Sequence, residues 1–140
     1  MKNILSSLII AINFLCVFAC TAQSSNDPYW EFIEEKHFKP KLNTGEFYTL
    51  TGFDFGWYVL EPLTQFIEDR DHEFERSKSL SYGQKALYYW WYLDAQVTNG
   101  GFAQFYSNGY GHYIPAIINC LEYVGATAMA NLAKKAEKVY

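Results

Sequence analysis

The segment from residue 81 to residue 97 constrains the fold of this chain more than any other. Ser81 and Gln84 stand three positions apart, which is the spacing of a capping box at the start of a helix. Beyond this start, apolar side chains recur at the spacing of one helical face, at Ala86, Trp90, Leu93 and Val97. Aromatic residues cover most of the remaining circumference, at Tyr88, Tyr89, Trp91 and Tyr92. We therefore predict a helix from Tyr82 to about Val97 that is buried on several sides.

The residues around this helix predict further helices separated by turns. Asn99–Gly101 tolerates the left-handed conformation that ends many helices, and Gly125 is expected to end another. Asp27 followed by Pro28 is typical of a helix start. The shorter helices predicted in this way are Tyr29–His37, Phe102–Tyr106, Pro115–Val124 and Ala128–Tyr140.

The stretch Glu46–Leu60 fits two periods. Large apolar residues at odd positions fit a strand, but a helix that starts after Asp54 and is kinked at Pro62 also fits. We favour the helix and expect helical structure to continue over Leu63–Asp71. The chain is thus predicted to be all-α, with a compact helical domain of about five to six helices over residues 28–140.

The first 22 residues have the pattern of an export signal. Lys2 precedes a mostly apolar segment, Ile4–Phe18, which is too short for a comfortable membrane span. A polar stretch follows at once, as expected after a cleavage site. Residues 23–27 would then form a short tether to the helical domain.

Two cleavage sites are compatible with this signal. Val17–Cys20 resembles a lipobox, in which Cys20 is lipidated and becomes the mature N-terminus. The alternative is ordinary cleavage after Ala22, which leaves no lipid. We expect a lipoprotein of the cell membrane or outer membrane that faces the periplasm or the surface. With the alternative cleavage the protein would be soluble in the periplasm or secreted.

Composition narrows the possible functions. Half the residues are apolar and 19% are aromatic, so a packed core is expected and the aromatic surplus also suits a binding surface. The formal net charge of −4 argues against non-specific binding of nucleic acid, which needs a basic face. With Cys20 lipidated, Cys120 has no disulfide partner. Its apolar neighbours favour a small buried side chain over a catalytic thiol.

No pattern of residues predicts a metal, a cofactor or a catalytic group. His37, His72 and His112 are scattered, and none stands at ligand spacing from another His, Cys or Asp. The sequence lacks the phosphate-binding, dinucleotide-binding and serine-hydrolase fingerprints. The acidic run Glu68–Glu75 is interpreted as a solvated helix end, with a protein-binding face as the alternative.

The stretch Ser81–Gly111, SYGQKALYYWWYLDAQVTNGGFAQFYSNGYG, resembles the DNA-mimic-protein-19-like domain family, most of whose members are domains of unknown function. The resemblance implies an all-helical fold and a domain that runs further than Tyr140. The last predicted helix also reaches the end of the chain without a stop signal, so we expect a C-terminally incomplete domain. One member of that family is an acidic mimic of DNA. The mild charge and the export signal of this chain point away from that role.

The region around the glycine pair contains the candidate site residues, which are Trp91, Asp94, Asn99, Gly100, Gly101, Phe102, Gln104, Phe105 and Asn108. The structural interpretation is that the glycines turn the chain, the phenylalanines pack and the amides satisfy backbone groups. The functional interpretation is a small-ligand or anion pocket at the start of the following helix. Asp94 is expected to be a buried anchor for the loop, with a general base as the alternative.

The molecular function is not encoded in any motif that we recognise. We expect a non-catalytic protein-interaction module of the cell envelope, with a protein partner, membrane attachment through lipid, no cofactor and no nucleic acid. The alternative is an enzyme or a small-ligand-binding protein that uses the Asn99–Asn108 loop, with Asp94 and Gln104 among its polar groups.

Overall fold

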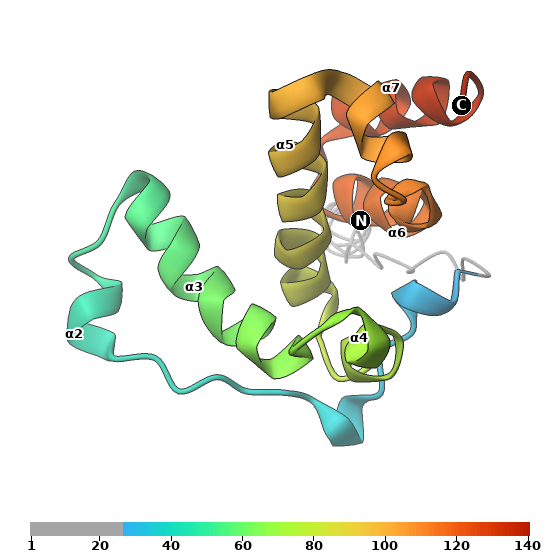
Figure 1. The fold of residues 1–140 in the computed structure, drawn as a ribbon. Helices are drawn as coiled ribbons and strands as arrows, with labels where there is room; N and C mark the ends of the chain where they lie inside the picture. Colours follow the sequence, from blue (N-terminus) through green and yellow to red (C-terminus); the bar gives the residue numbers. More distant parts are fainter. Residues whose placement is uncertain (1–26) are drawn as a thin grey trace, which may run out of the picture.

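The computed structural model describes residues 27–140, and within this range the chain forms helices and no strand (Figure 1). The all-α prediction is therefore confirmed. The predicted signal, the lipobox with Cys20 and most of the tether lie outside the described residues. The elements in chain order are η1 (Pro28–Trp30), η2 (Glu34–Lys36), α2 (Thr44–Phe47), α3 (Gly52–Ile67), α4 (Arg70–Ser77), α5 (Tyr82–Ser107), η3 (Gly111–Tyr113), α6 (Ile114–Tyr123) and α7 (Thr127–Glu137).

Helix α5 is the long central element, α6 packs against it, and α7 packs on α6 (Figure 1). The capping box that the sequence predicted is present: the backbone N–H of Ser81 donates to Gln84 Oε1 at 2.8 Å. The core between these helices is closed by fully buried Tyr89, Phe105 and Ile117. Small residues, Ala130 and Ala133, let α7 approach closely.

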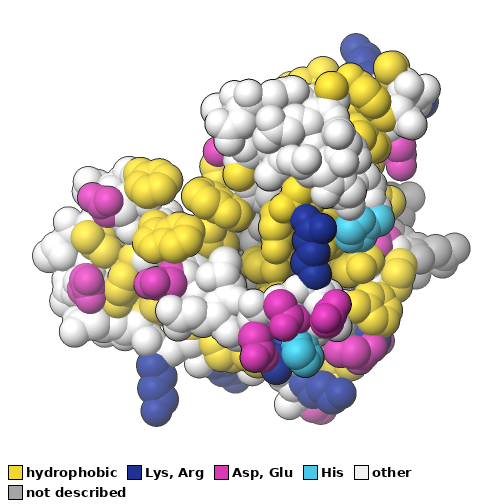
Figure 2. Space-filling view, viewed as in Figure 1, with side chains coloured by type: hydrophobic (Ala, Val, Ile, Leu, Met, Phe, Trp, Pro, Cys, Tyr) yellow, Lys and Arg dark blue, Asp and Glu magenta, His cyan; other side chains and the backbone are white. Residues whose placement is uncertain are grey.

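Helix α2 and the first half of α3 stand away from this body (Figure 1). The buried residues of α3, Leu60, Leu63 and Ile67, all lie in its second half and follow helical spacing. Figure 2 shows hydrophobic side chains gathered on the surface of the projecting segment. Tyr48 and Phe53, which belong to this part of the chain, are more than two-thirds exposed.

The predicted helix Tyr29–His37 is wrong. Two short 3₁₀ turns, η1 and η2, stand there instead, with extended backbone at Glu31 and Ile33. The N–H of Ile33 donates to the carbonyl of Lys78, and the N–H of Phe38 donates to that of Ser79, both at 2.8 Å. These backbone bonds to a distant segment replace the bonds of a continuous local helix, and sequence periodicity does not reveal them.

The helical alternative for Glu46–Leu60 is confirmed, because α3 runs from Gly52 to Ile67 with Pro62 inside it. The helix begins earlier than the predicted start after Asp54. Its predicted continuation through Asp71 is wrong: Glu68 has a φ of 74°, and Asp69 begins a new helix. The Asp69 carboxylate accepts from the N–H groups of Asp71 and His72, both at 3.0 Å, so it caps α4.

The C-terminal predictions differ from the structure at the helix ends. Helix α5 and the short helix predicted at Phe102–Tyr106 form one element with a kink at the glycine pair. Gly125, with a φ of 77°, follows α6 as predicted. The last helix, α7, ends at Glu137 and not at Tyr140.

Candidate functional site

The glycine pair makes the kink in α5. Gly101 has φ 70° and ψ −173°, a conformation that is essentially restricted to glycine. Gly100 has a φ of −152°, and a Cβ atom there would lie 2.8 Å from the Cβ of Gln104. The chain therefore needs glycine at both positions, for backbone conformation at one and for space at the other.

The amide side chains of the motif are bonded to the protein itself. Gln104 Nε2 donates to Gln96 Oε1 at 3.1 Å, and Asn108 Nδ2 donates to the same oxygen at 2.7 Å. Asn99 Nδ2 donates to the backbone carbonyl of Ala95 at 2.7 Å. Gln104 was expected to bond backbone, but its partner is the side chain of Gln96, which the sequence analysis did not single out. These bonds brace the kink and leave no cluster of convergent free amides.

The remaining predicted site residues are dispersed. Asp94 is exposed, so the expectation that it is a buried anchor is wrong; it accepts from Thr98 on its own helix at 3.4 Å. Phe105 is fully buried and Phe102 is partly buried against the core. Trp91 faces the projecting segment, with its ring centroid 5.5 Å from that of Trp57. The structure thus does not gather Asp94 and Trp91 into one pocket with the loop.

An open apolar groove lies on another surface of the molecule. A groove of about 410 Å³ runs between α5, α6 and α7. Its lining has no charged side chain and consists of Gly83, Ala86, Leu87, Trp90, Cys120, Leu121, Val124, Ala126 and Met129.

The walls of this groove are large side chains that remain in contact with solvent. Trp90 is 40% exposed, Met129 43% and Val124 59%. The small residues Gly83 and Ala86 stand on the α5 side, and a Cβ atom added at Gly83 would meet open space. Within the apolar stripe of the helix that was predicted to be buried on several sides, Ala86 and Leu93 are buried, whereas Trp90 is exposed and lines the groove together with Ala86.

Cys120 lies in this groove but is not a reactive thiol. Its side chain is 1% exposed, and burial raises the pKa of the thiol well above its usual range. This agrees with the predicted role as a small buried hydrophobic residue.

A second depression, of about 510 Å³, lies between η1, η3 and the ends of α6 and α7. Its lining is mixed and includes Asp27, His112 and Glu137. The Asp27 carboxylate caps Tyr29 N–H at 3.0 Å and accepts from Asn119 at 3.3 Å, so it has a structural role there. The described residues contain no group of three or more His, Cys, Asp or Glu that could hold a metal ion.

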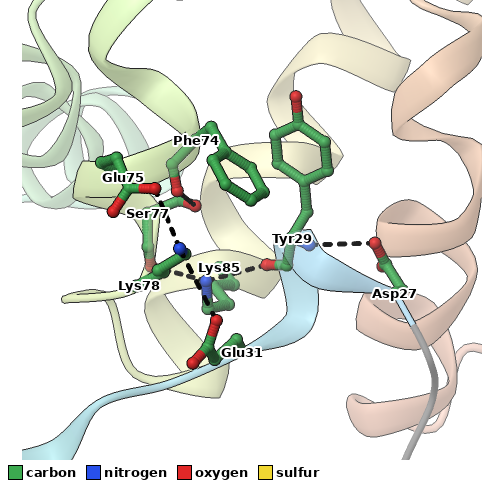
Figure 3. A network of polar contacts seen from close by, with 8 residues as sticks. All are labelled: Asp27, Tyr29, Glu31, Phe74, Glu75, Ser77, Lys78 and Lys85. Carbon is green, nitrogen blue, oxygen red and sulfur yellow. Dashed lines mark hydrogen bonds and ion pairs between the residues drawn. The ribbon is translucent and has the colours of Figure 1, made fainter.

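Two buried ionisable residues were missed by the sequence analysis. Lys85 is fully buried, and its Nζ donates to the carbonyl oxygens of Tyr29 at 2.8 Å and Ser77 at 2.5 Å (Figure 3). Burial lowers the pKa of Lys85 to about 8. Through these two hydrogen bonds Lys85 holds η1 and the end of α4 against α5. The other residue is Glu73, which belongs to the acidic run that was interpreted as solvated but is only 1% exposed.

The fold is all-helical over the described residues, and one of its surfaces carries an open apolar groove. The residues that line the groove lie within the one segment that a family model matches. Residues 78–140 match the family model described as DMP19-like protein. This segment contains α5, α6 and α7, and it includes the stretch that carried the resemblance in the sequence. No curated protein and no solved structure matched the chain.

Proposed function

We propose that this protein is a non-catalytic interaction module that binds an apolar helical segment of a partner protein in the groove between α5, α6 and α7. The observation that carries the proposal is the groove itself, which is open, is lined by no charged side chain and is walled by Trp90 and Met129. Exposed contiguous apolar surface is typical of binding sites. Grooves between helices accept the apolar face of an amphipathic helix, and aromatic and methionine side chains are favoured at such contacts.

Photo-crosslinking in intact cells tests this function. A photoreactive amino acid at Met129, inside the groove, should give a discrete adduct with a partner protein. The matched control is the same amino acid at Leu132, which lies on the same helix, is 49% exposed and does not line the groove. A partner that reacts equally at both positions, or at neither, would count against the groove.

We also propose that the module works outside the cytoplasm on a lipid anchor at Cys20. The support is the signal pattern with its lipobox-like end at Val17–Cys20. A diacylated cysteine is a stable anchor, because two acyl chains hold a protein at a membrane where one does not. No helix between residues 27 and 140 is long and apolar enough to cross a membrane.

The anchor is tested by metabolic labelling with a fatty-acid analogue. Wild-type protein should be labelled and should sediment with membranes, whereas Cys20→Ala should lose the label. Labelling that persists in Cys20→Ala would contradict lipidation at this residue.

A further inference from the structure

The carboxyl group of Glu73 is buried where α4, α5 and η3 meet. Tyr113 donates its hydroxyl hydrogen to Glu73 Oε2, and Glu73 Oε1 has no hydrogen-bond partner. No ion pair to Glu73 is formed within residues 27–140. A buried carboxylate without a cation loses its hydration and regains little of it from one hydrogen bond, so ionisation is costly at this position.

The groups that face Glu73 do not neutralise its charge. Its neighbours on the packed elements are phenols: Tyr29 from η1, Tyr88, Tyr89 and Tyr92 from α5, and Tyr113 from η3. The nearest cation is Arg70 on α4, whose guanidinium lies 4.4 Å from the centroid of the Tyr110 ring. His112 packs on Tyr113 with ring centroids 3.8 Å apart, and its Nδ1 lies 2.8 Å from the carbonyl oxygen of Gly109.

We propose that the buried carboxyl group of Glu73 is a proton-dependent joint between α4 and η3. The neutral acid is stable where the two elements meet, whereas the anion, although it accepts a stronger bond from Tyr113, regains its hydration only when they part. The neutral acid needs no counter-ion, whereas the anion does. The far end of α4 remains held, because Lys85 bonds the carbonyl of Ser77 there.

The direction of the pH dependence follows from burial. Desolvation raises the pKa of Glu73 above its usual value, and the bond from Tyr113 and the charge of Arg70 offset part of that rise. Because the pKa of Glu73 is higher in the folded protein than in the unfolded chain, the neutral side chain contributes its full stabilisation at a pH below the pKa of the unfolded chain. That stabilisation is lost as the pH rises through the folded pKa. The joint is therefore closed in acid and loosened toward neutral pH.

Hydrogen exchange of the full-length chain from pH 4 to pH 8 tests the joint, once rates are corrected for intrinsic exchange. Each unit by which the pKa is raised is worth about tenfold in the opening equilibrium. The N–H groups of residues 74–76 make helical bonds within α4, so their protection should fall as the pH rises in wild type and should fall clearly less in Glu73→Gln. The matched control Glu75→Gln, an exposed carboxylate on the same helix, should behave as wild type. His112→Gln should also keep the fall.

Wild-type protection that is independent of pH would overturn the proposal, as would a fall that survives in Glu73→Gln or disappears in His112→Gln. If Glu73→Gln does not fold, the side-chain carboxyl carbon of Glu73 is titrated by NMR in the wild-type chain. A midpoint above that of an exposed glutamate supports the joint, and a midpoint at or below it contradicts it.

Discussion

Lys85 shows at the scale of one residue how a charged side chain can organise a helical core. Its Nζ satisfies two carbonyl groups from segments that lie 56 and 8 residues away in the sequence. Lys85→Met keeps the volume but leaves both carbonyls without this donor. It should lower the free energy of unfolding by on the order of 2–4 kcal/mol, measured by urea denaturation. Lys78→Met should cost clearly less, because Glu31 and Glu75, which pair with Lys78, are exposed to solvent. Equal losses in the two variants would contradict this role.

The same lysine predicts a rise of stability in alkaline solution. The pKa of Lys85 is lowered to about 8 in the folded protein. The contribution of the neutral side chain to the free energy of unfolding is therefore fully present above the pKa of Lys85 in the unfolded chain, about 10.4. That contribution is lost as the pH falls through about 8. Wild type should therefore gain stability between about pH 8 and pH 10, and Lys85→Met should lack that gain. Thermal denaturation across this range measures both, and a parallel profile in the two proteins would exclude Lys85 as the cause.

At the scale of one element, the kink in α5 depends on two glycines for different reasons. Gly101→Ala forces a Cβ atom into a conformation that only glycine adopts readily, so it should destabilise the protein by roughly 1–3 kcal/mol. Gly100→Ala displaces Gln104 and with it the bond to Gln96, so it should also destabilise. Gly83→Ala in the first turn of the same helix meets open space and should be neutral or stabilising. Unchanged melting in both kink variants would refute this account.

Local sequence signals predicted the elements that are held by local forces. The capping box and the glycine pair fixed the start and the kink of α5, because both act through neighbouring residues. The segment Tyr29–His37 was mispredicted because its middle is held by a distant segment: the N–H of Ile33 bonds the carbonyl of Lys78. The burial of Glu73 depends on how α4 meets η3. A run of mixed acidic and basic residues is typical of an exposed helix, so the sequence contains no signal that Glu73 is buried.

At the scale of the whole molecule, the helical stripe of α5 has a double role. Leu93 closes the core, while Ala86 and Trp90 face a groove that α6 and α7 leave open. Periodicity identifies an apolar stripe but does not state whether another helix of the same chain covers all of it. The candidate site could therefore not be found from sequence, although two of its α5 residues, Ala86 and Trp90, had been placed on one face.

The most direct test of the groove is to fill it without disturbing the fold. Gly83→Leu places a side chain into the open space, and Gly83→Ala adds one methyl group at the same position as the matched control. Both variants should melt no lower than wild type. In cells that carry the photoreactive residue at Met129, Gly83→Leu should reduce the partner adduct at least about tenfold, the equivalent of about 1.4 kcal/mol of binding. Gly83→Ala should reduce it little. An adduct that is equally strong in Gly83→Leu would show that the partner binds elsewhere.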